Sequence, residues 1–257
     1  MLNSSNDIVL ITGGSSGIGF EMARLLLEEN YLVIICGRSK LKLEEAQRKL
    51  PKLITIQCDI TSTQDRERLV DRIKNEYPSL TLLINNAGVV YRYLMEKTGD
   101  LNKRMEEEWK TNVMAPVELS QLLLPCIAKN GGTVVNVSSA LAHVPLSIEP
   151  HYCATKAALH SITQSMRIRY KKIGVKVVEI FYPEVDTPFQ EGQATERAIS
   201  PEVAAYEALR QLKRGKDEIY VKRSKMMFRI SRLLPKKGVK IINGFLPEMV
   251  EEMLSKR

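Results

Sequence analysis

The sequence lacks the features that mark a membrane-spanning or secreted protein. No apolar run approaches the roughly 18 residues that a transmembrane helix needs. The opening MLNSSNDIVLITGG has no basic region ahead of a long apolar stretch, so we expect no signal peptide. Both absences favour a cytoplasmic protein, in which any membrane contact would be peripheral, at the inner membrane face.

Cysteine and histidine are also scarce, and neither forms a pattern typical of a disulfide framework or a metal site. The chain has 4 cysteines without a CxxC pair and 3 histidines without metal-ligand spacing. Cys36 and Cys58 end apolar runs typical of buried strands, where a free thiol behaves as a small hydrophobic group. We therefore expect reduced thiols, no metal and a cytoplasmic setting.

A basic surface covering the whole protein is missing as well, although the chain has a net charge of +8. Residues 1–221 hold 28 basic and 27 acidic side chains, a net +1, whereas residues 222–257 hold 10 and 3, a net +7. A nucleic-acid-binding domain carries a basic patch or stripe, which a nearly neutral body does not offer. We expect no nucleic-acid partner, and we assign the excess charge to a C-terminal extension.

Short apolar runs alternate with amphipathic segments along the rest of the chain. The runs are rich in Val, Ile and Leu throughout, as in parallel strands that are covered on both faces. They lie at residues 8–12, 31–36, 53–58, 80–85, 132–138, 175–181 and 218–221. Helical patterns occupy residues 17–29, 40–50, 62–76, 103–129, 151–172 and 201–214.

This order predicts an α/β fold of the Rossmann type. We expect a doubly wound, mostly parallel seven-stranded sheet with helices on both faces. Residues 1–221 would form a single dinucleotide-binding and catalytic domain. Residues 222–257 would form a basic amphipathic helical appendage to it.

The first predicted strand runs into LITGGSSGIG, in which Gly13, Gly17 and Gly19 form a G-x-x-x-G-x-G pattern. Glycines in such a turn let the backbone approach a pyrophosphate at the positive N-terminus of the next helix. Turn-forming glycines are common, so the triplet alone is weak. Its position directly between a strand and a helix makes it a candidate dinucleotide site.

The stretch SSALAHVPLSIEPHYCATK, residues 138–156, places Tyr152 thirteen residues after Ser139 and four before Lys156. Positions i and i+4 share one face of a helix, so the ammonium group would lie near the phenol oxygen. A nearby cation lowers the pKa of a phenol, and a general acid or base works best when its pKa lies near the working pH. An isolated YxxxK is more often a surface tyrosine and a solvated lysine, so this pair depends on the motifs around it.

Taken together, the motifs resemble the short-chain dehydrogenase/reductase family, in its order and spacing, over about residues 7–221. They are TGGSSGIG (12–19), the pair Asp59-Ile60, NNAG (85–88), Asn112, the interval from Ser139 to Tyr152, and YCATK (152–156). Three further stretches, VIICGRS, HYCATKAALHS and PEVDT, are similar to one bacterial oxidoreductase within that family.

The resemblance implies four catalytic residues: Asn112, Ser139, Tyr152 and Lys156. Tyr152 would be the general acid/base, and Ser139 would donate a hydrogen bond to the substrate oxygen, with the adjacent Ser138 as the alternative. In the family, the residue at the position of Asn112 distorts its helix so that a backbone carbonyl holds a water near the lysine. Strand-end serines also cap loops, and asparagine is simply a poor helix former, so these roles rest on the family likeness.

The resemblance also implies a cofactor site, in which Asp59 contacts adenine and Val185 and Thr187 meet the nicotinamide carboxamide. Its residues would be Gly13, Ser15, Ser16, Gly17, Ile18, Gly19, Arg38, Asp59, Ile60, Asn86, Ala87, Gly88, Tyr152, Lys156, Pro183, Val185 and Thr187. After the sixth strand the family usually reads Pro-Gly, whereas this chain reads Pro183-Glu184. The shape of the substrate loop at 188–200 is therefore left open.

The choice between NADP(H) and NAD(H) depends on CGRSK, residues 36–40. An acidic residue after the second strand would bind the ribose 2′-OH of NAD, and none is present. Arg38 offers a planar guanidinium suited to a 2′-phosphate, with Ser39 and Lys40 beside it. Arg38 could instead be a solvated residue at a helix start, but the combination favours NADP(H) over NAD(H).

These residues favour an NADP-preferring carbonyl reductase or alcohol dehydrogenase that acts on a small-molecule or lipid-like substrate. The alternative is a non-catalytic redox-sensing or lipid-surface binding module on a retained dehydrogenase fold, which would not need the Ser-Tyr-Lys set. The helices at 103–129 and 151–172 carry more apolar and small residues than one buried stripe requires, including Ala154 and Ala157. Because their family equivalents pair across a two-fold axis, we expect a homodimer or a tetramer.

The extension contains VKRSKMMFRISRLLPKKGVK, residues 221–240, with eight basic residues and no acidic one. One face of a helix there would carry Met226, Ile230, Leu233 and Leu234. Basic amphipathic helices can lie in a membrane interface, which predicts peripheral membrane contact through residues 222–240. The stripe could instead dock on the body or on a neighbouring subunit, and we favour docking because four apolar residues make a short stripe.

Overall fold

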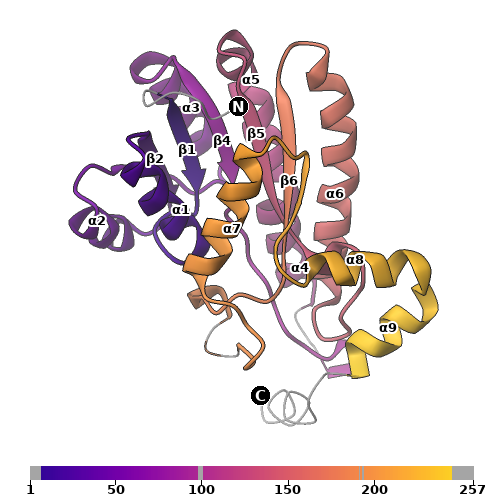
Figure 1. The fold of residues 1–257 in the computed structure, drawn as a ribbon. Helices are drawn as coiled ribbons and strands as arrows, with labels where there is room; N and C mark the ends of the chain where they lie inside the picture. Colours follow the sequence, from indigo (N-terminus) through magenta and orange to yellow (C-terminus); the bar gives the residue numbers. More distant parts are fainter. Residues whose placement is uncertain (1–6, 98–100, 191, 193, 245–257) are drawn as a thin grey trace.

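Seven strands form one fully parallel sheet in the computed structural model, which describes residues 7–97, 101–190, 192 and 194–244. The strand order is β3-β2-β1-β4-β5-β6-β7, so the direction of winding reverses between β1 and β4 (Figure 1). The strands are β1 (Ile8–Thr12), β2 (Leu32–Gly37), β3 (Ile54–Gln57), β4 (Leu80–Asn85), β5 (Thr133–Ser139), β6 (Lys176–Tyr182) and β7 (Glu218–Tyr220). Every predicted strand is present with both ends within one residue of the expected position, which confirms the Rossmann-type α/β fold.

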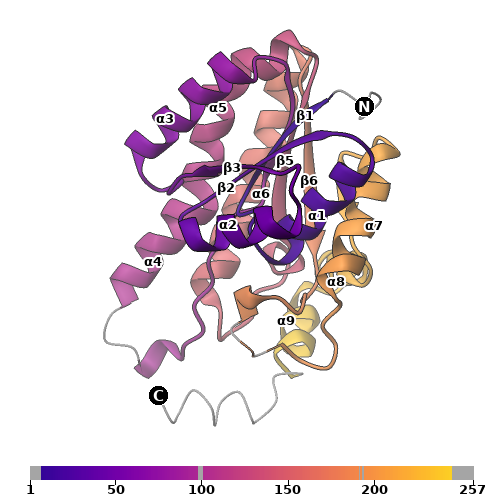
Figure 2. The same ribbon diagram turned by 90° about the vertical axis from the view of Figure 1, so that its left-hand side faces the viewer.

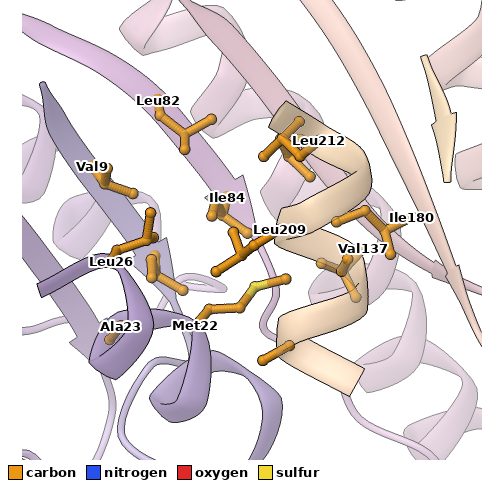
Figure 3. Close-up of a cluster of buried hydrophobic side chains, with 14 of the residues drawn as sticks. Val9, Met22, Ala23, Leu26, Leu82, Ile84, Val137, Ile180, Leu209 and Leu212 are labelled. Carbon is orange, nitrogen blue, oxygen red and sulfur yellow. The ribbon is translucent and has the colours of Figure 1, made fainter. Parts of the chain in front are cut away.

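Helices cover both faces of the sheet. One face is covered by α1 (Gly17–Glu28), α2 (Lys40–Lys49) and α7 (Pro201–Lys213). The other face is covered by α3 (Thr63–Glu76), α5 (Ala115–Lys129) and α6 (Pro150–Lys171). Figure 3 shows side chains of α1 and α7, such as Met22 and Leu209, packed on the first face.

The central strands owe their Val/Ile/Leu composition to this double cover. The neighbouring residues Leu10 and Ile11 point to opposite faces, and both are fully buried. Burying such a side chain stabilises the fold by roughly 1.5 to 3 kcal/mol. The packing therefore fixes the carboxyl ends of the strands, where the loops of the site begin.

The single helix predicted over residues 103–129 is three elements instead. α4 (Leu101–Trp109) is followed by the π-helical turn η2 (Lys110–Met114) and then by α5. Pro116 lacks the amide hydrogen that would bond the carbonyl of Asn112 four residues earlier, so the chain widens there. The distortion expected at Asn112 is present, but the prediction of one continuous helix is wrong.

The C-terminal extension forms two short helices on the body, α8 (Ser224–Leu233) and α9 (Pro235–Gly244). Pro235 separates them, because the residue before a proline disfavours helical backbone. Residues 245–257 of the predicted extension lie outside the described residues. None of the helices that the structure describes is long and apolar enough to cross a membrane.

The predicted apolar stripe is not the face through which the extension docks. Met226, Leu233 and Leu234 are 56%, 77% and 47% exposed. The buried contacts are made by Ser224 and by the ring of Phe228, on the other side of α8. The interpretation that the stripe docks on the chain's own body is therefore wrong, because the helix turns a different face to the body. Docking on a neighbouring subunit stays a prediction.

Candidate active site

The glycine turn after β1 lies at the carboxyl edge of the sheet, beside the point where the strand order reverses. Gly17 has a φ of +55°, in the left-handed region that favours glycine. A Cβ added to Gly19 would lie 2.5 Å from Nδ2 of Asn86 and 2.7 Å from the carbonyl oxygen of Gly13. The glycines therefore let the first turn pack directly against the segment that follows β4.

The start of α1 fits an anionic group. Ser16 precedes the helix in an extended conformation and makes no capping hydrogen bond through its side chain, and the first turn holds no acidic residue. Amide hydrogens at a helix N-terminus lack intrahelical partners and carry partial positive charge. Ser15 and Ile18 are half-buried in this turn and Ser16 is exposed, so the predicted residues line a turn suited to a pyrophosphate.

Thr12 ties the NNAG segment to the glycine turn. Its Oγ1 accepts hydrogen bonds from the amides of Asn86 at 3.0 Å and Ala87 at 3.1 Å. The Asn86 side chain donates in return to the carbonyl of Thr12 at 3.0 Å. Next in line, a Cβ on Gly88 would lie 3.2 Å from Oδ1 of Asn112. Residues 86–88 thus form one wall of the site, and Thr12, which sequence reasoning missed, holds it.

Arg38 lies on the exposed rim directly after β2. Its side chain is 59% exposed, and its Nη1 lies 3.6 Å from a carboxylate oxygen of Glu107. Glu107 also accepts a hydrogen bond from the hydroxyl of Tyr91 at 2.6 Å. The neighbouring Ser39 caps α2 by accepting from the amide of Lys42 at 3.3 Å. The guanidinium therefore projects from the rim, and Glu107 would compete with any phosphate for it.

Asp59 and Ile60 form a tight turn after β3. Oδ1 of Asp59 accepts hydrogen bonds from the amide and the hydroxyl of Thr61, at 2.9 and 2.8 Å. The carbonyl of Ile60 accepts from Nη1 of Arg66 at 2.7 Å, and the Ile60 side chain is buried in the core. Both residues therefore stabilise this turn. A contact between Asp59 and adenine stays a prediction.

Ser139, Tyr152 and Lys156 meet at the end of β5 and the start of α6, where they are 9%, 8% and 4% exposed. Nζ of Lys156 lies 5.6 Å from the centroid of the Tyr152 ring and donates to the carbonyl of Val137 at 2.9 Å. Oγ of Ser139 accepts from the amide of Leu141 at 3.1 Å and is hydrogen-bonded to Tyr152. The structure therefore brings the predicted Ser-Tyr-Lys set together.

Burial is the largest influence on the pKa of Tyr152. Desolvation raises this pKa well above its usual value, the charge of Glu149 raises it further, and the hydrogen bond with Ser139 lowers it. Desolvation also lowers the pKa of Lys156 to about 8. That Lys156 lowers the pKa of Tyr152 stays a prediction.

Asn112 fastens the segment after β4 to α6. Its Oδ1 accepts from the amide of Val89 at 2.9 Å. Its Nδ2 donates to the carbonyl of Val89 at 2.9 Å and to Oγ1 of Thr155 at 3.1 Å. The side chain is fully engaged, so any part in proton transfer would fall to the backbone carbonyl, to which Pro116 cannot donate a hydrogen bond.

Glu184, which stands where the family usually has glycine, holds the substrate loop. Its Oε1 accepts from the amide of Thr195 at 2.9 Å, and its Oε2 accepts from the hydroxyl of Thr195 at 2.6 Å. Next to it, Val185 forms a parallel bridge with Ile199. The carboxylate of Glu184 thus connects the segment after β6 to the loop at 188–200, whose shape the sequence did not predict.

The segment after β6 also reaches the glycine turn. A Cβ on Gly17 would lie 3.1 Å from Cγ2 of Thr187. Pro183 and Val185 are buried between these two parts of the chain and the core. The three predicted residues of this segment, Pro183, Val185 and Thr187, therefore lie at the edge where the first turn opens.

A second set of residues across the site was missed by sequence reasoning. Nε of Arg92 lies 2.7 Å from Oε1 of Glu149, with 14% and 6% of the two side chains exposed. Arg92 also donates to Oε1 of Gln190, in the 3₁₀ turn η4 (Pro188–Gln190) of the substrate loop. From the same turn, the ring of Phe189 lies 5.9 Å from that of Tyr152. No local pattern marks this set, because three distant segments bring it together.

Known proteins resemble this chain in sequence and in fold. The family model described as short chain dehydrogenase matches residues 7–198. The chain belongs to the short-chain dehydrogenase family. It is therefore an oxidoreductase with the nucleotide-binding fold of that family.

Of two curated relatives of this short-chain dehydrogenase, one has a name that gives a substrate and a cofactor, and the other is named only as an oxidoreductase. DltE of Bacillus subtilis (strain 168), named an uncharacterized oxidoreductase, is 42% identical over 230 residues, which are 85% of this chain and 89% of DltE. It is the bacterial oxidoreductase to which the three sequence stretches are similar. An NAD-dependent glycerol dehydrogenase of Listeria innocua serovar 6a is 33% identical over 181 residues, which are 68% of this chain and 69% of that protein.

Solved structures share the fold at lower identity. A short chain dehydrogenase from Burkholderia cenocepacia J2315 in complex with NADP has a TM-score of 0.84 at 23% identity, and the match covers 93% of this chain and 99% of that chain. A short-chain dehydrogenase from Sphingobium yanoikuyae in complex with NADPH has a TM-score of 0.77 at 22% identity, covering 91% and 94%. At these identities the likeness shows the fold alone.

Proposed function

We propose that this oxidoreductase is an NADP-preferring carbonyl reductase/alcohol dehydrogenase in which Tyr152 is the general acid/base. The observation that carries the proposal is the buried contact of Tyr152 with Ser139 and Lys156, at the sheet edge where the glycine turn opens. Desolvating three polar groups costs stability. A binding module does not need these buried polar groups, whereas an acid/base site needs them for proton transfer.

NADP(H) is the proposed cofactor, and when bound its nicotinamide supplies or accepts the hydride. The glycine turn and the N-terminus of α1 would hold the pyrophosphate. Arg38 would bind the 2′-phosphate bidentately in place of its contact with Glu107. The Burkholderia structure holds NADP, whereas the Listeria relative is NAD-dependent by name, so Arg38 decides the preference in this proposal.

In the direction of reduction, Tyr152 donates its phenolic proton to the carbonyl oxygen while the Ser139 hydroxyl donates a hydrogen bond to the same atom. Because the pKa of Lys156 is about 8, its ammonium group is mostly protonated at neutral pH and stabilises the phenolate that remains. The backbone carbonyl of Asn112, to which Pro116 cannot donate, would offer a route by which a proton returns through Lys156.

The proposal is tested by NADPH consumption with a panel of ketones, aldehydes and acyl-lipid carbonyls. We expect turnover with at least one class of carbonyl, and we expect the matching alcohol to reduce NADP in the reverse assay. If the folded protein binds NADPH but turns over none of the panel in either direction, the binding-module alternative replaces this proposal.

The proposal extends to setting and assembly. All four cysteines are free, as suits a reducing cytoplasm. The enzyme would be a homodimer or tetramer, joined through the outer faces of α5 and α6. Residues 1–221 would form the catalytic unit, acting on a small-molecule or lipid-like substrate.

A further inference from the structure

The helix α8 presents large apolar side chains to solvent. Met226 and Leu233 are seven residues apart, so they lie on one face, and they are 56% and 77% exposed. The opposite face packs on the body: the ring of Phe228 lies 5.1 Å from that of Tyr220 and 5.0 Å from that of His143. The chain's own core therefore packs against the Phe228 face of α8 and leaves the Met226 and Leu233 face exposed.

The helix α9 packs against α8 and is fastened beside the active site. A Cβ on Gly238 would lie 3.1 Å from Cγ2 of Ile230, so the two helices are in close contact. Oδ1 of Asn243 accepts from the amide of Ser147 at 2.7 Å, and its Nδ2 donates to the carbonyl of Pro145 at 3.0 Å. Both partners belong to the segment that joins the catalytic serine to the catalytic tyrosine.

Further apolar side chains of the two helices are exposed. Leu234, at the joint between the helices, is 47% exposed, and Val239 and Ile241 on α9 are each 39% exposed. Figures 1 and 2 both place α8 and α9 at the end of the molecule where the loops after the parallel strands lie. The two helices therefore lie at the same end of the molecule as the candidate site.

Basic side chains surround these apolar ones. Residues 222–244 include eight basic residues and no acidic one. Lys222 lies 3.6 Å from Glu207, and Arg223 donates to the carbonyl of Arg197. Six exposed basic residues form no ion pair within the described part of the chain: Lys225, Arg229, Arg232, Lys236, Lys237 and Lys240.

We propose that the α8–α9 surface docks on an anionic lipid bilayer. Apolar side chains projecting among unpaired basic ones match an interface in which acyl chains lie below negatively charged headgroups. A second copy of the chain suits the surface less, because a two-fold contact would bring the same six unpaired charges face to face. The charge and the apolar protrusions together therefore select lipid as the occupant.

Membrane binding through α8 and α9 would fix how the candidate active site is oriented relative to the bilayer. Because Asn243 on α9 is hydrogen-bonded to the segment between Ser139 and Tyr152, a membrane bound at α8–α9 would lie near that segment of the candidate site. Resting on the proposed function, this arrangement favours a carbonyl substrate that is dissolved in, or attached to, the lipid phase. Vesicle binding itself does not depend on catalysis, so the two proposals can fail separately.

The test is sedimentation of the full chain with phosphatidylglycerol-containing vesicles and with pure phosphatidylcholine vesicles, at low and high salt. We expect binding to the anionic vesicles that weakens with salt. Met226→Ser with Leu233→Ser should weaken binding about tenfold or more, as should Lys236→Glu with Lys237→Glu. Matched controls on the body, Ile173→Ser and Lys52→Glu with Lys129→Glu, should bind like the parent.

Each other outcome overturns the proposal. It fails if the parent does not bind anionic vesicles, if neutral vesicles bind equally well, or if the surface variants bind like the parent. It also fails if Leu233→Ser changes the oligomeric mass in light scattering, because the surface would then be a contact between chains. Circular dichroism of every variant shows whether a loss of binding reflects the surface or unfolding.

Discussion

Tyr152 is buried, and burial disfavours the phenolate form of its side chain. Burial and the charge of Glu149 raise its pKa, while the hydrogen bond with Ser139 lowers it. Tyr152→Phe keeps the ring and removes the proton donor. We expect turnover to fall by a factor on the order of 10² or more, with NADPH affinity nearly unchanged. Steady-state assays and a fluorescence titration of NADPH measure the two effects.

Tyr182 supplies the matched control for this substitution. It is also buried, and its hydroxyl has no hydrogen-bond partner among the described residues. Tyr182→Phe should leave turnover within about threefold of the parent. If Tyr152→Phe is equally harmless, Tyr152 is not the acid.

Arg38 is exposed and weakly held, which suits a residue that selects between two cofactors. Its contact with Glu107 spans 3.6 Å at the surface, and exposed pairs of this kind contribute little to stability. Arg38→Asp should therefore fold normally, weaken NADPH binding and strengthen NADH binding relative to the parent. Titration of both cofactors against both proteins decides it. A parent that already prefers NADH would show that Arg38 does not bind a 2′-phosphate.

Glu108 makes the stability of the protein depend on pH. Burial raises its pKa to about 7, while the charges of Glu149 and Glu107 add to the rise and the amide of Tyr91 opposes it. A raised pKa means that the folded state holds the proton more tightly than the unfolded state. This contribution to stability is present below the ordinary pKa of 4.5 and is lost as the pH rises through 7.

Glu108→Gln removes that titration. From about pH 4.5 to 7.5, the free energy of unfolding of the variant should rise relative to the parent by on the order of 2 kcal/mol. Urea unfolding at several pH values measures the difference. Glu106→Gln, an exposed change on the same helix, should run parallel to the parent across this range, and parallel curves for Glu108→Gln would contradict the prediction.

At the scale of elements, the sequence predicts strands better than it predicts interrupted helices. The Val/Ile/Leu runs identify the inner strands because these strands are buried on both faces, so composition alone marks them. The edge strands β3 and β7 are only partly buried, although their apolar runs also mark them. The break at η2 depends on Pro116 removing a hydrogen bond from the carbonyl of Asn112, a signal that the apolar period does not contain. Propensity marks Asn112 as unusual without giving the π-helical turn.

The candidate site divides in the same way. Its glycine turn and its Ser-Tyr-Lys set are local patterns, and the sequence predicts them. Arg92, Glu149 and Gln190 come from three segments that only the tertiary fold brings together. No spacing along the sequence therefore predicts their contact. The docking face of α8 was missed for a related reason: Phe228 packs on aromatic rings from β7 and from beyond η3 (Ala140–Ala142), which the helical period does not reveal.

The turn η4 brings an aromatic ring close to the reacting groups. The Phe189 ring lies 5.9 Å from that of Tyr152, and its Cε2 would lie 3.7 Å from a Cβ on Gly88. Phe189→Ala should widen this part of the site, so that bulky ketones gain in kcat/KM relative to small aldehydes. The control is Tyr206→Ala, an aromatic side chain on α7 that is 57% exposed. Equal changes for bulky and small substrates would show that Phe189 does not limit substrate size.

At the scale of the whole molecule, α6 leaves a face that the monomer does not use. Ala154, Ala157 and Ser161 lie exposed on it, and Ile168 on the same face is 67% exposed. Small residues let two helices approach closely, and a two-fold axis would pair this face with itself. On α5, Leu122 adds a further exposed apolar side chain.

We therefore expect a homodimer or tetramer at micromolar concentration, measured by light scattering. Ile168→Glu places two like charges near each other across the axis and should shift the mass towards the 29.1 kDa of one chain. Ile173→Glu, on an exposed isoleucine beyond the end of α6, should leave the mass unchanged. A parent that already scatters as one chain would contradict the pairing, and an assembly insensitive to Ile168→Glu would place the contact on another face.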